Sequence, residues 1–144
     1  MARTDKFRKE HGELLTLANE LQALLNVEAL SRDGSAARSC LGKLLGKLML
    51  HLAAEDKVLY PELVGSKDPV LAGLAKQFSI EMKSTDAQVA EYSERWPTPS
   101  SIKASPAEFI KETKQVVSII TNRIKRENQE LYAAADSIEG KSFS

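Results

Sequence analysis

Cysteine, histidine and aromatic residues are all scarce in this sequence. Its 144 residues include one cysteine, two histidines and 6% aromatic residues. The single thiol, Cys40, excludes a disulfide within the chain and is typical of a reducing compartment. A glycine-rich phosphate-binding loop is also absent from the sequence. A disulfide-stapled scaffold and a phosphate-loop protein are therefore excluded.

An excess of charge of one sign is missing too. Lysine and arginine number 20, aspartate and glutamate number 20, and the formal net charge is +0. Nucleic-acid binders need a basic surplus to neutralise phosphates, so we expect no nucleic-acid partner. No apolar run approaches the ~20 residues of a membrane span, so we expect no membrane partner. The opening MARTDKFRKEHGE lacks the apolar core of a signal peptide, and we predict a cytoplasmic protein.

What the sequence does contain is helical periodicity. Apolar residues recur at three- and four-residue steps in four segments, and no segment alternates as a strand would. The segments cover residues 5–27, 35–64, 69–96 and 105 onward, separated by SRDGS, GSKDP and PTPSS. We predict an all-α fold, an antiparallel up-down-up-down four-helix bundle over residues 1–138 with a flexible tail at 139–144.

Local signals predict how these helices begin and bend. Asp68 and Pro69 have the residue types of an N-cap and a first helical position. Residues 105–108, Ser-Pro-Ala-Glu, match a capping box. Pro61 lies inside the second segment, where its ring should kink or fray the last turn.

Polar and sulfur-containing side chains interrupt the apolar stripes of all four helices. They are His11, His51, Glu55, Met82, Asp86, Arg123 and Glu127. With antiparallel neighbours and ~1.5 Å of rise per residue, these positions share one layer near one end of the bundle. A buried carboxylate is costly unless it is paired or bound to a cation, so the cluster indicates a shared partner.

His51 and Glu55 lie four residues apart, so both project from the same face of one helix. Together with His11 and Glu127 they make a mixed nitrogen and oxygen set, which suits Fe or Zn better than Mg or Ca. The alternative is a metal-free polar core, in which the histidines salt-bridge to the glutamates and Arg123 balances the charge. With both histidines in this layer, no base remains for a serine or cysteine nucleophile, and we expect no catalytic residues.

Two stretches of the chain are alike. HLAAEDKVLYPEL (51–63) and RIKRENQELYAAA (123–135) pair Glu55 with Glu127 and Tyr60 with Tyr132, but His51 with Arg123. We expect the two tyrosines to hydrogen-bond across the end of the bundle or to pack there.

These stretches and FRKEHGELL, which carries His11, resemble the hemerythrin-like (HHE cation-binding) domain family over nearly the whole chain. The resemblance implies a four-helix bundle with a non-haem di-iron centre that binds dioxygen or serves in oxygen, iron or redox sensing. It implies that His11 and His51 match the ligands of the first iron. It also implies that Glu55 and Glu127 match the carboxylates that bridge the two irons.

The sequence departs from the family at the second iron. The third-helix histidine position falls at or beside Met82, and the fourth falls at Arg123. Two metals would need Glu81 or Asp86 as substitute ligands. Arg123 has two alternative places: its guanidinium occupies the vacated metal position and pairs with both glutamates, or it snorkels to the end of the bundle.

We therefore predict a metal-binding protein that is not an enzyme and holds one metal ion rather than two. The predicted ligands are His11, His51, Glu55 and Glu127. Non-haem iron is the expected metal, with zinc or no metal as alternatives, and dioxygen is a candidate ligand of the iron. The alternative function is a metal-free interaction or regulatory bundle whose ancestral site has become a polar core. The protein partner is not predicted.

Overall fold

The computed structural model describes residues 4–142, and their side chains up to residue 138. Every regular element in this range is a helix, which confirms the predicted all-α class. Among these residues, no helix combines the length and hydrophobicity that a membrane span requires.

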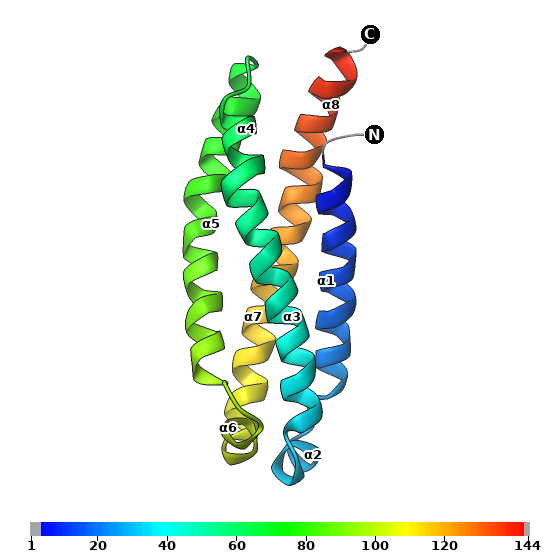
Figure 1. Cartoon of the computed structure of the whole chain (residues 1–144), viewed down its shortest axis with the longest axis vertical. Coiled ribbons are helices and arrows are strands. Elements are labelled where there is room, and N and C mark those ends of the chain that lie inside the picture. Colours follow the sequence, from blue (N-terminus) through cyan, green and yellow to red (C-terminus); the bar gives the residue numbers. More distant parts are fainter. Residues whose placement is uncertain (1–3, 143–144) are drawn as a thin grey trace.

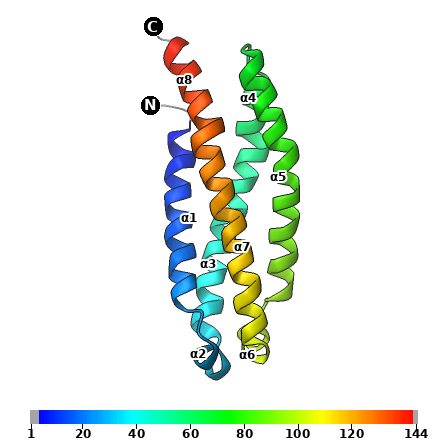
Figure 2. The ribbon, with the colours of Figure 1, turned by 180° about the vertical axis from the view of Figure 1, so that it is seen from behind.

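Long helical rods run side by side (Figure 1). Two of them are built from consecutive segments: α3, η1 and α4 form one, and α7, η2 and α8 form another (Figure 2). The rods comprise α1 (Asp5–Ala23), α3 (Ser35–Ala54) with η1 (Glu55–Leu59) and α4 (Tyr60–Val64), α5 (Pro69–Arg95), and α7 (Pro106–Arg126) with η2 (Glu127–Tyr132) and α8 (Ala133–Ser142). Short helices α2 (Val27–Arg32) and α6 (Pro99–Ala104) lie at the end opposite the two chain termini (Figure 1).

The links between rods differ from the prediction in two places. The first predicted helix ends at Ala23, because Asn26 accepts a hydrogen bond from the Ala29 amide and starts the separate helix α2. The stretch PTPSS is not an open loop but begins α6, where Thr98 and Ser101 form a reciprocal capping box.

Two helix starts were predicted from their caps. Asp68 caps α5 as predicted, accepting hydrogen bonds from the Val70 and Leu71 amides. The capping box predicted at 105–108 is wrong, because the Ser105 side chain makes no capping hydrogen bond to the described residues. At the C-terminus α8 reaches Ser142, so residues 139–142 of the predicted tail are helical, while 143 and 144 lie outside the described residues.

Segments η1 and η2 are single wide turns of π-helix within otherwise α-helical rods. Pro61 follows the first of them and neither frays nor ends the helix, which continues to Val64. Beyond the second wide turn, Ala135 is buried and Ala134 is partly buried against the same cluster. π-Turns of this kind are rare and often lie at functional sites.

The apolar core consists of two clusters, one on either side of the predicted polar layer. The larger lies toward α2 and α6 and includes Leu14, Leu48 and Ile120. The smaller lies toward α4 and α8 and includes Phe7 and Met82. The polar residues therefore sit inside the protein, where burial of the surrounding apolar side chains excludes water from them.

Candidate metal centre

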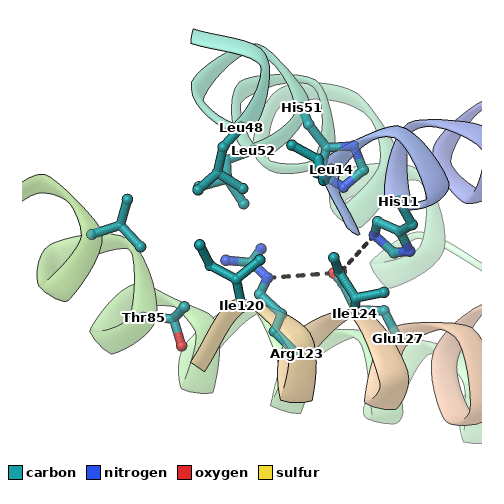
Figure 3. Close-up of a pocket in the computed structure, with 11 residues that line it drawn as sticks. His11, Leu14, Leu48, His51, Leu52, Thr85, Ile120, Arg123, Ile124 and Glu127 are labelled. Atoms are coloured by element: carbon teal, nitrogen blue, oxygen red, sulfur yellow. Dashed lines mark ion pairs between the residues drawn. The ribbon is translucent and has the colours of Figure 1, made fainter. Parts of the chain in front are cut away.

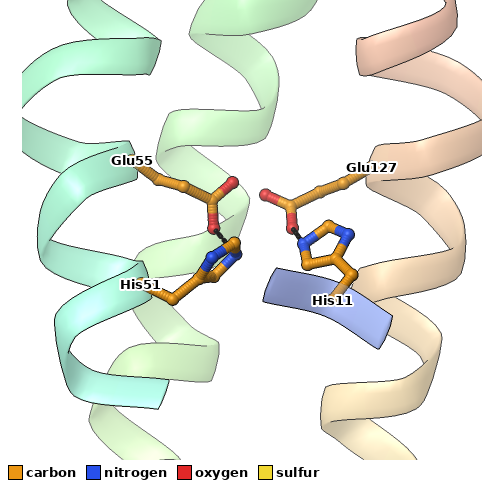
Figure 4. A group of neighbouring side chains, drawn as sticks. All are labelled: His11, His51, Glu55 and Glu127. Carbon is orange, nitrogen blue, oxygen red and sulfur yellow. Dashed lines mark ion pairs between the residues drawn. The ribbon is translucent and has the colours of Figure 1, made fainter. Parts of the chain in front are cut away.

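Four predicted ligands converge in this layer. His11, His51, Glu55 and Glu127 each offer one ligand atom, and these atoms all lie within 4.8 Å of one another. His11 comes from α1, His51 from the end of α3, and each glutamate opens one of the π-turns (Figure 4). All four are buried, at 3% exposure or less, so solvent cannot screen their charges.

The outer nitrogen of each imidazole is already bound to an acceptor. His51 Nδ1 lies 2.8 Å from Glu10 Oε1, and His11 Nδ1 lies 2.8 Å from Asn128 Oδ1. Both partners are oxygen acceptors, so Nδ1 of each ring carries the hydrogen and donates it. In the neutral ring Nε2 then keeps its lone pair and faces inward. This is the arrangement of metal-ligating histidines, whose outer nitrogen donates to a carboxylate or carbonyl.

Glu10 and Asn128 were not predicted as part of the centre. Each is a chain neighbour of a predicted ligand, and that adjacency is the one signal the sequence offered. Glu10 reaches His51 only because α1 packs along α3, and Asn128 reaches His11 only because α1 also packs along α7, the helix that leads into η2.

The inner nitrogens face carboxylate oxygens (Figure 4). His51 Nε2 lies 2.8 Å from Glu55 Oε1, and His11 Nε2 lies 3.1 Å from Glu127 Oε1. Despite these short separations, His51 Nε2 and both Oε1 atoms lack a hydrogen bond of acceptable geometry to any described residue. Buried acceptors that face one another without a hydrogen between them fit a cation that all of them can ligate.

The outer oxygens of the glutamates are bound by tyrosines from the opposite rod. Tyr132 donates to Glu55 Oε2 at 2.8 Å, and Tyr60 donates to Glu127 Oε2 at 2.5 Å. Of the two predicted roles for these tyrosines, hydrogen bonding is therefore present. Their bonds cross between the two rods that carry the π-turns.

Arg123 lies against Glu127 (Figure 3) and against Glu55, in the layer where the fourth-helix histidine was expected. Its side chain is 5% exposed, so the alternative that it snorkels to the end of the bundle is wrong. Nη2 lies 3.6 Å from Glu55 Oε1 and Nε lies 3.7 Å from Glu127 Oε2. These are ion-pair separations, too long for hydrogen bonds, and the hydrogen bond goes instead from Nη1 to Asp86 Oδ1 at 2.5 Å.

The other residues considered for a second metal are engaged elsewhere. Met82 packs in the smaller apolar cluster. Both oxygens of Glu81 are bound on the surface, by Gln77 and Arg126. Asp86 is bound to Arg123. Each of these three residues therefore has a partner other than a metal ion.

The two buried carboxyl groups differ in acidity. Burial and the neighbouring Glu127 charge raise the pKa of Glu55 well above its usual value. Burial acts in the same direction on Glu127, but contacts with Glu55 and His11 and the charge of Arg123 outweigh it and lower the pKa of Glu127 to about 2. Glu55 therefore holds its proton more tightly than an ordinary carboxyl group does, and a cation that binds both carboxylates competes with that proton.

A small cavity of about 10 Å³ lies beside the centre (Figure 3). Its walls include Leu14, Leu48 and Ile120 together with His11 and Arg123. This is space on the order of a single water molecule. A ligand of that size can therefore be accommodated next to the inward Nε2 atoms.

The fold and the centre together define a class: an all-helical protein with a buried histidine–glutamate group suited to a cation. The hemerythrin HHE cation binding domain family matches residues 2–135, and the chain belongs to that family. No curated protein and no solved structure matches the chain significantly.

Proposed function

We propose that the chain is a hemerythrin-like, up-down-up-down four-helix bundle that binds one non-haem metal ion and serves in oxygen, iron or redox binding or sensing. Its predicted ligands are His11, His51, Glu55 and Glu127. We propose binding rather than catalysis, because both histidines of the sequence are committed to this centre.

One observation supports the proposed metal site most directly. Each of the four residues has its outer atom tied to a partner and its inner atom turned toward the others. Three of the inner atoms have no hydrogen-bond partner among the described residues. Leaving buried acceptors unpaired costs about 1–3 kcal/mol each, and a bound cation removes that cost.

Charge supports one ion rather than two. Arg123 is a permanent cation, and the carboxylates of Glu127 and Glu55 outweigh the effect of its burial and raise its pKa further. One divalent ion together with Arg123 balances the carboxylates of Glu55, Asp86 and Glu127. A second divalent ion would leave surplus positive charge in a buried place.

The donor set supports iron, with zinc as the alternative metal, because two imidazoles and two carboxylates suit both ions. Bound iron would supply redox chemistry and an affinity for small ligands. The cavity beside Arg123 supports dioxygen as such a ligand, since the space is narrow and largely apolar.

A second candidate is a metal-free regulatory or interaction bundle. The short pairs His51–Glu55 and His11–Glu127 favour it, because protonated imidazoles at these distances would neutralise both carboxylates. In that case the centre is a structural ion-pair layer, and the protein acts through a partner.

Metal analysis of protein purified without chelator separates the two candidates. We expect close to one Fe or Zn per chain, lost in His51→Ala. Glu81→Gln is the matched control, since this carboxylate is bound on the surface, and it should keep the metal. Adding Fe(II) or Zn(II) to the stripped protein should raise its unfolding temperature, because a ligand of the folded state stabilises it by mass action. Absence of both metal and stabilisation would contradict the proposed metal site.

A further inference from the structure

The two crossed tyrosines have a role that goes beyond filling the end of the bundle. We propose that Tyr60 and Tyr132 form a reciprocal clamp that holds the outer oxygen of each glutamate, so that each carboxylate offers a single oxygen to a single metal ion. This inference rests on the proposed function and assigns two positioning residues to its centre.

The π-turns explain why a glutamate and a tyrosine five residues apart both face inward. In an α-helix, residues five apart point about 140° away from each other. The wider turn of a π-helix brings them closer to one face. Glu55 and Tyr60 span η1, Glu127 and Tyr132 span η2, and all four side chains are buried.

Proline does not account for the two π-turns. Pro61 follows η1, but the equivalent residue after η2 is Ala133. What the two segments share is the glutamate at the first position and the tyrosine five residues later. The common arrangement is therefore connected with the crossed hydrogen bonds rather than with a local backbone restriction.

Each tyrosine is well suited to donate and poorly suited to ligate. A phenol has one hydrogen to donate, and Tyr132 places it on Glu55 Oε2 at 2.8 Å, whereas His11 Nε2 is 3.5 Å from the same hydroxyl. Tyr60 likewise places its hydrogen on Glu127 Oε2, at 2.5 Å.

The clamp determines how the carboxylates can bind. A carboxylate that chelates one ion, or bridges two ions with one oxygen on each, needs both of its oxygens. Here Oε2 of Glu55 and of Glu127 is taken by a tyrosine, and only Oε1 faces an imidazole Nε2. Each tyrosine bond occupies one lone pair of an Oε2 atom and makes that oxygen a poorer metal ligand, so the clamp favours one ion bound by one oxygen from each glutamate, for a reason independent of Arg123.

The experiment uses Co(II) as the probe metal and two single substitutions, Tyr60→Phe and Tyr132→Phe. Tyr92→Phe is the matched control, because Tyr92 is equally buried but its hydroxyl bonds Thr113 at 2.7 Å within the larger apolar cluster. We expect each clamp variant to lose roughly 10- to 100-fold in Co(II) affinity. We also expect weaker visible absorption, because a freed Oε2 can join the coordination and raise the coordination number. Tyr92→Phe should change neither.

Unchanged affinity and absorption in both clamp variants would overturn the clamp. Each substitution removes one oxygen atom, and if one of the two variants does not fold, the other alone decides the test. The unaltered protein supplies a second measurement: with Fe(III) it should lack the phenolate-to-iron charge-transfer band, and the presence of that band would make a tyrosine a ligand and also overturn the clamp. Unaltered protein that takes up no Co(II) or iron overturns the proposed metal site itself, a result distinct from failure of the clamp alone.

Discussion

The rod α3–η1–α4 and the rod α7–η2–α8 present the same frame to the centre with one decisive difference. Both have a π-turn that starts at a glutamate, and five residues after that glutamate comes a tyrosine bonded to the opposite rod. Four residues before the glutamate, however, one rod has His51 and the other has Arg123. The π-turn with its glutamate and tyrosine is therefore present in both rods, while the metal-ligating histidine is present in only one of these two rods.

The residue at the first position, His51, can bind a cation, whereas the residue at the second position, Arg123, is itself a cation. His51 has a lone pair on Nε2 once Nδ1 is bonded to Glu10, so it can ligate a metal. Arg123 has no lone pair to offer and carries a permanent charge among the same carboxylates. The half of the layer with His51 can thus bind a metal ion. In the other half, Arg123 is already the counter-ion of the carboxylates.

Replacing Arg123 by methionine should break this comparison most strongly. The change leaves Glu55 and Glu127 without their buried counter-ion, and we expect the free energy of unfolding of the metal-free protein to fall by about 3–5 kcal/mol. Urea denaturation in the presence of chelator measures it. The control is Arg126→Met, since that arginine is 32% exposed and pairs with Glu81, and a change of about 1 kcal/mol or less is expected. Equal losses in the two variants would show that Arg123 is not a buried counter-ion.

The next largest effect is expected on metal affinity, from removal of the two hydrogen-bond acceptors of the outer imidazole nitrogens. We expect Glu10→Ala and Asn128→Ala each to weaken Zn(II) binding by roughly 10- to 100-fold, because each removes the group that orients a ligand. The loss should be greater for Glu10, whose carboxylate makes the stronger, charge-assisted hydrogen bond. Calorimetric titration measures both affinities, with Glu13→Ala on the exposed face of α1 as the control. Metal binding unaffected by Glu10→Ala would contradict this role.

The smallest effect on stability is expected at Pro61. The equivalent residue of the other rod is Ala133, and both rods nevertheless form a π-turn. Pro61→Ala should lower the free energy of unfolding by about 0.4–1 kcal/mol, because proline restricts the unfolded chain. Metal affinity should stay unchanged, since η2 forms its π-turn without proline. Thermal unfolding and metal titration of the same variant provide both values. Loss of the metal in this variant would mean that the proline maintains η1 and that the two π-turns have different causes.

Much of this arrangement could be predicted from residue spacing. The three- and four-residue steps predicted the helices and which residues face inward, and His11, His51, Glu55 and Glu127 are all buried. Asp68 predicted the start of α5 for a local reason, since a cap bonds to amides within its own turn.

Two kinds of feature were not predicted: those where two local patterns compete, and those that depend on contacts between helices distant in the sequence. Asn26 ends α1 early because its own capping bond competes with continuation of the helix. The π-turns interrupt the α-helical pattern at Glu55 and Glu127, and a fixed helical period cannot foresee them. Glu10 lies beside the predicted stripe, and only its distance to His51 reveals its role.

By itself the sequence determined that the chain is helical, and it placed one polar layer within otherwise apolar stripes, because side-chain direction along a helix follows from spacing alone. Only the tertiary structure decided which atom faces which. Tyr60 reaches Glu127, Tyr132 reaches Glu55 and Arg123 reaches Asp86 across rods that are distant in the chain. Those pairings depend on how the rods pack against one another, and they leave the inward nitrogens and oxygens of the centre facing each other.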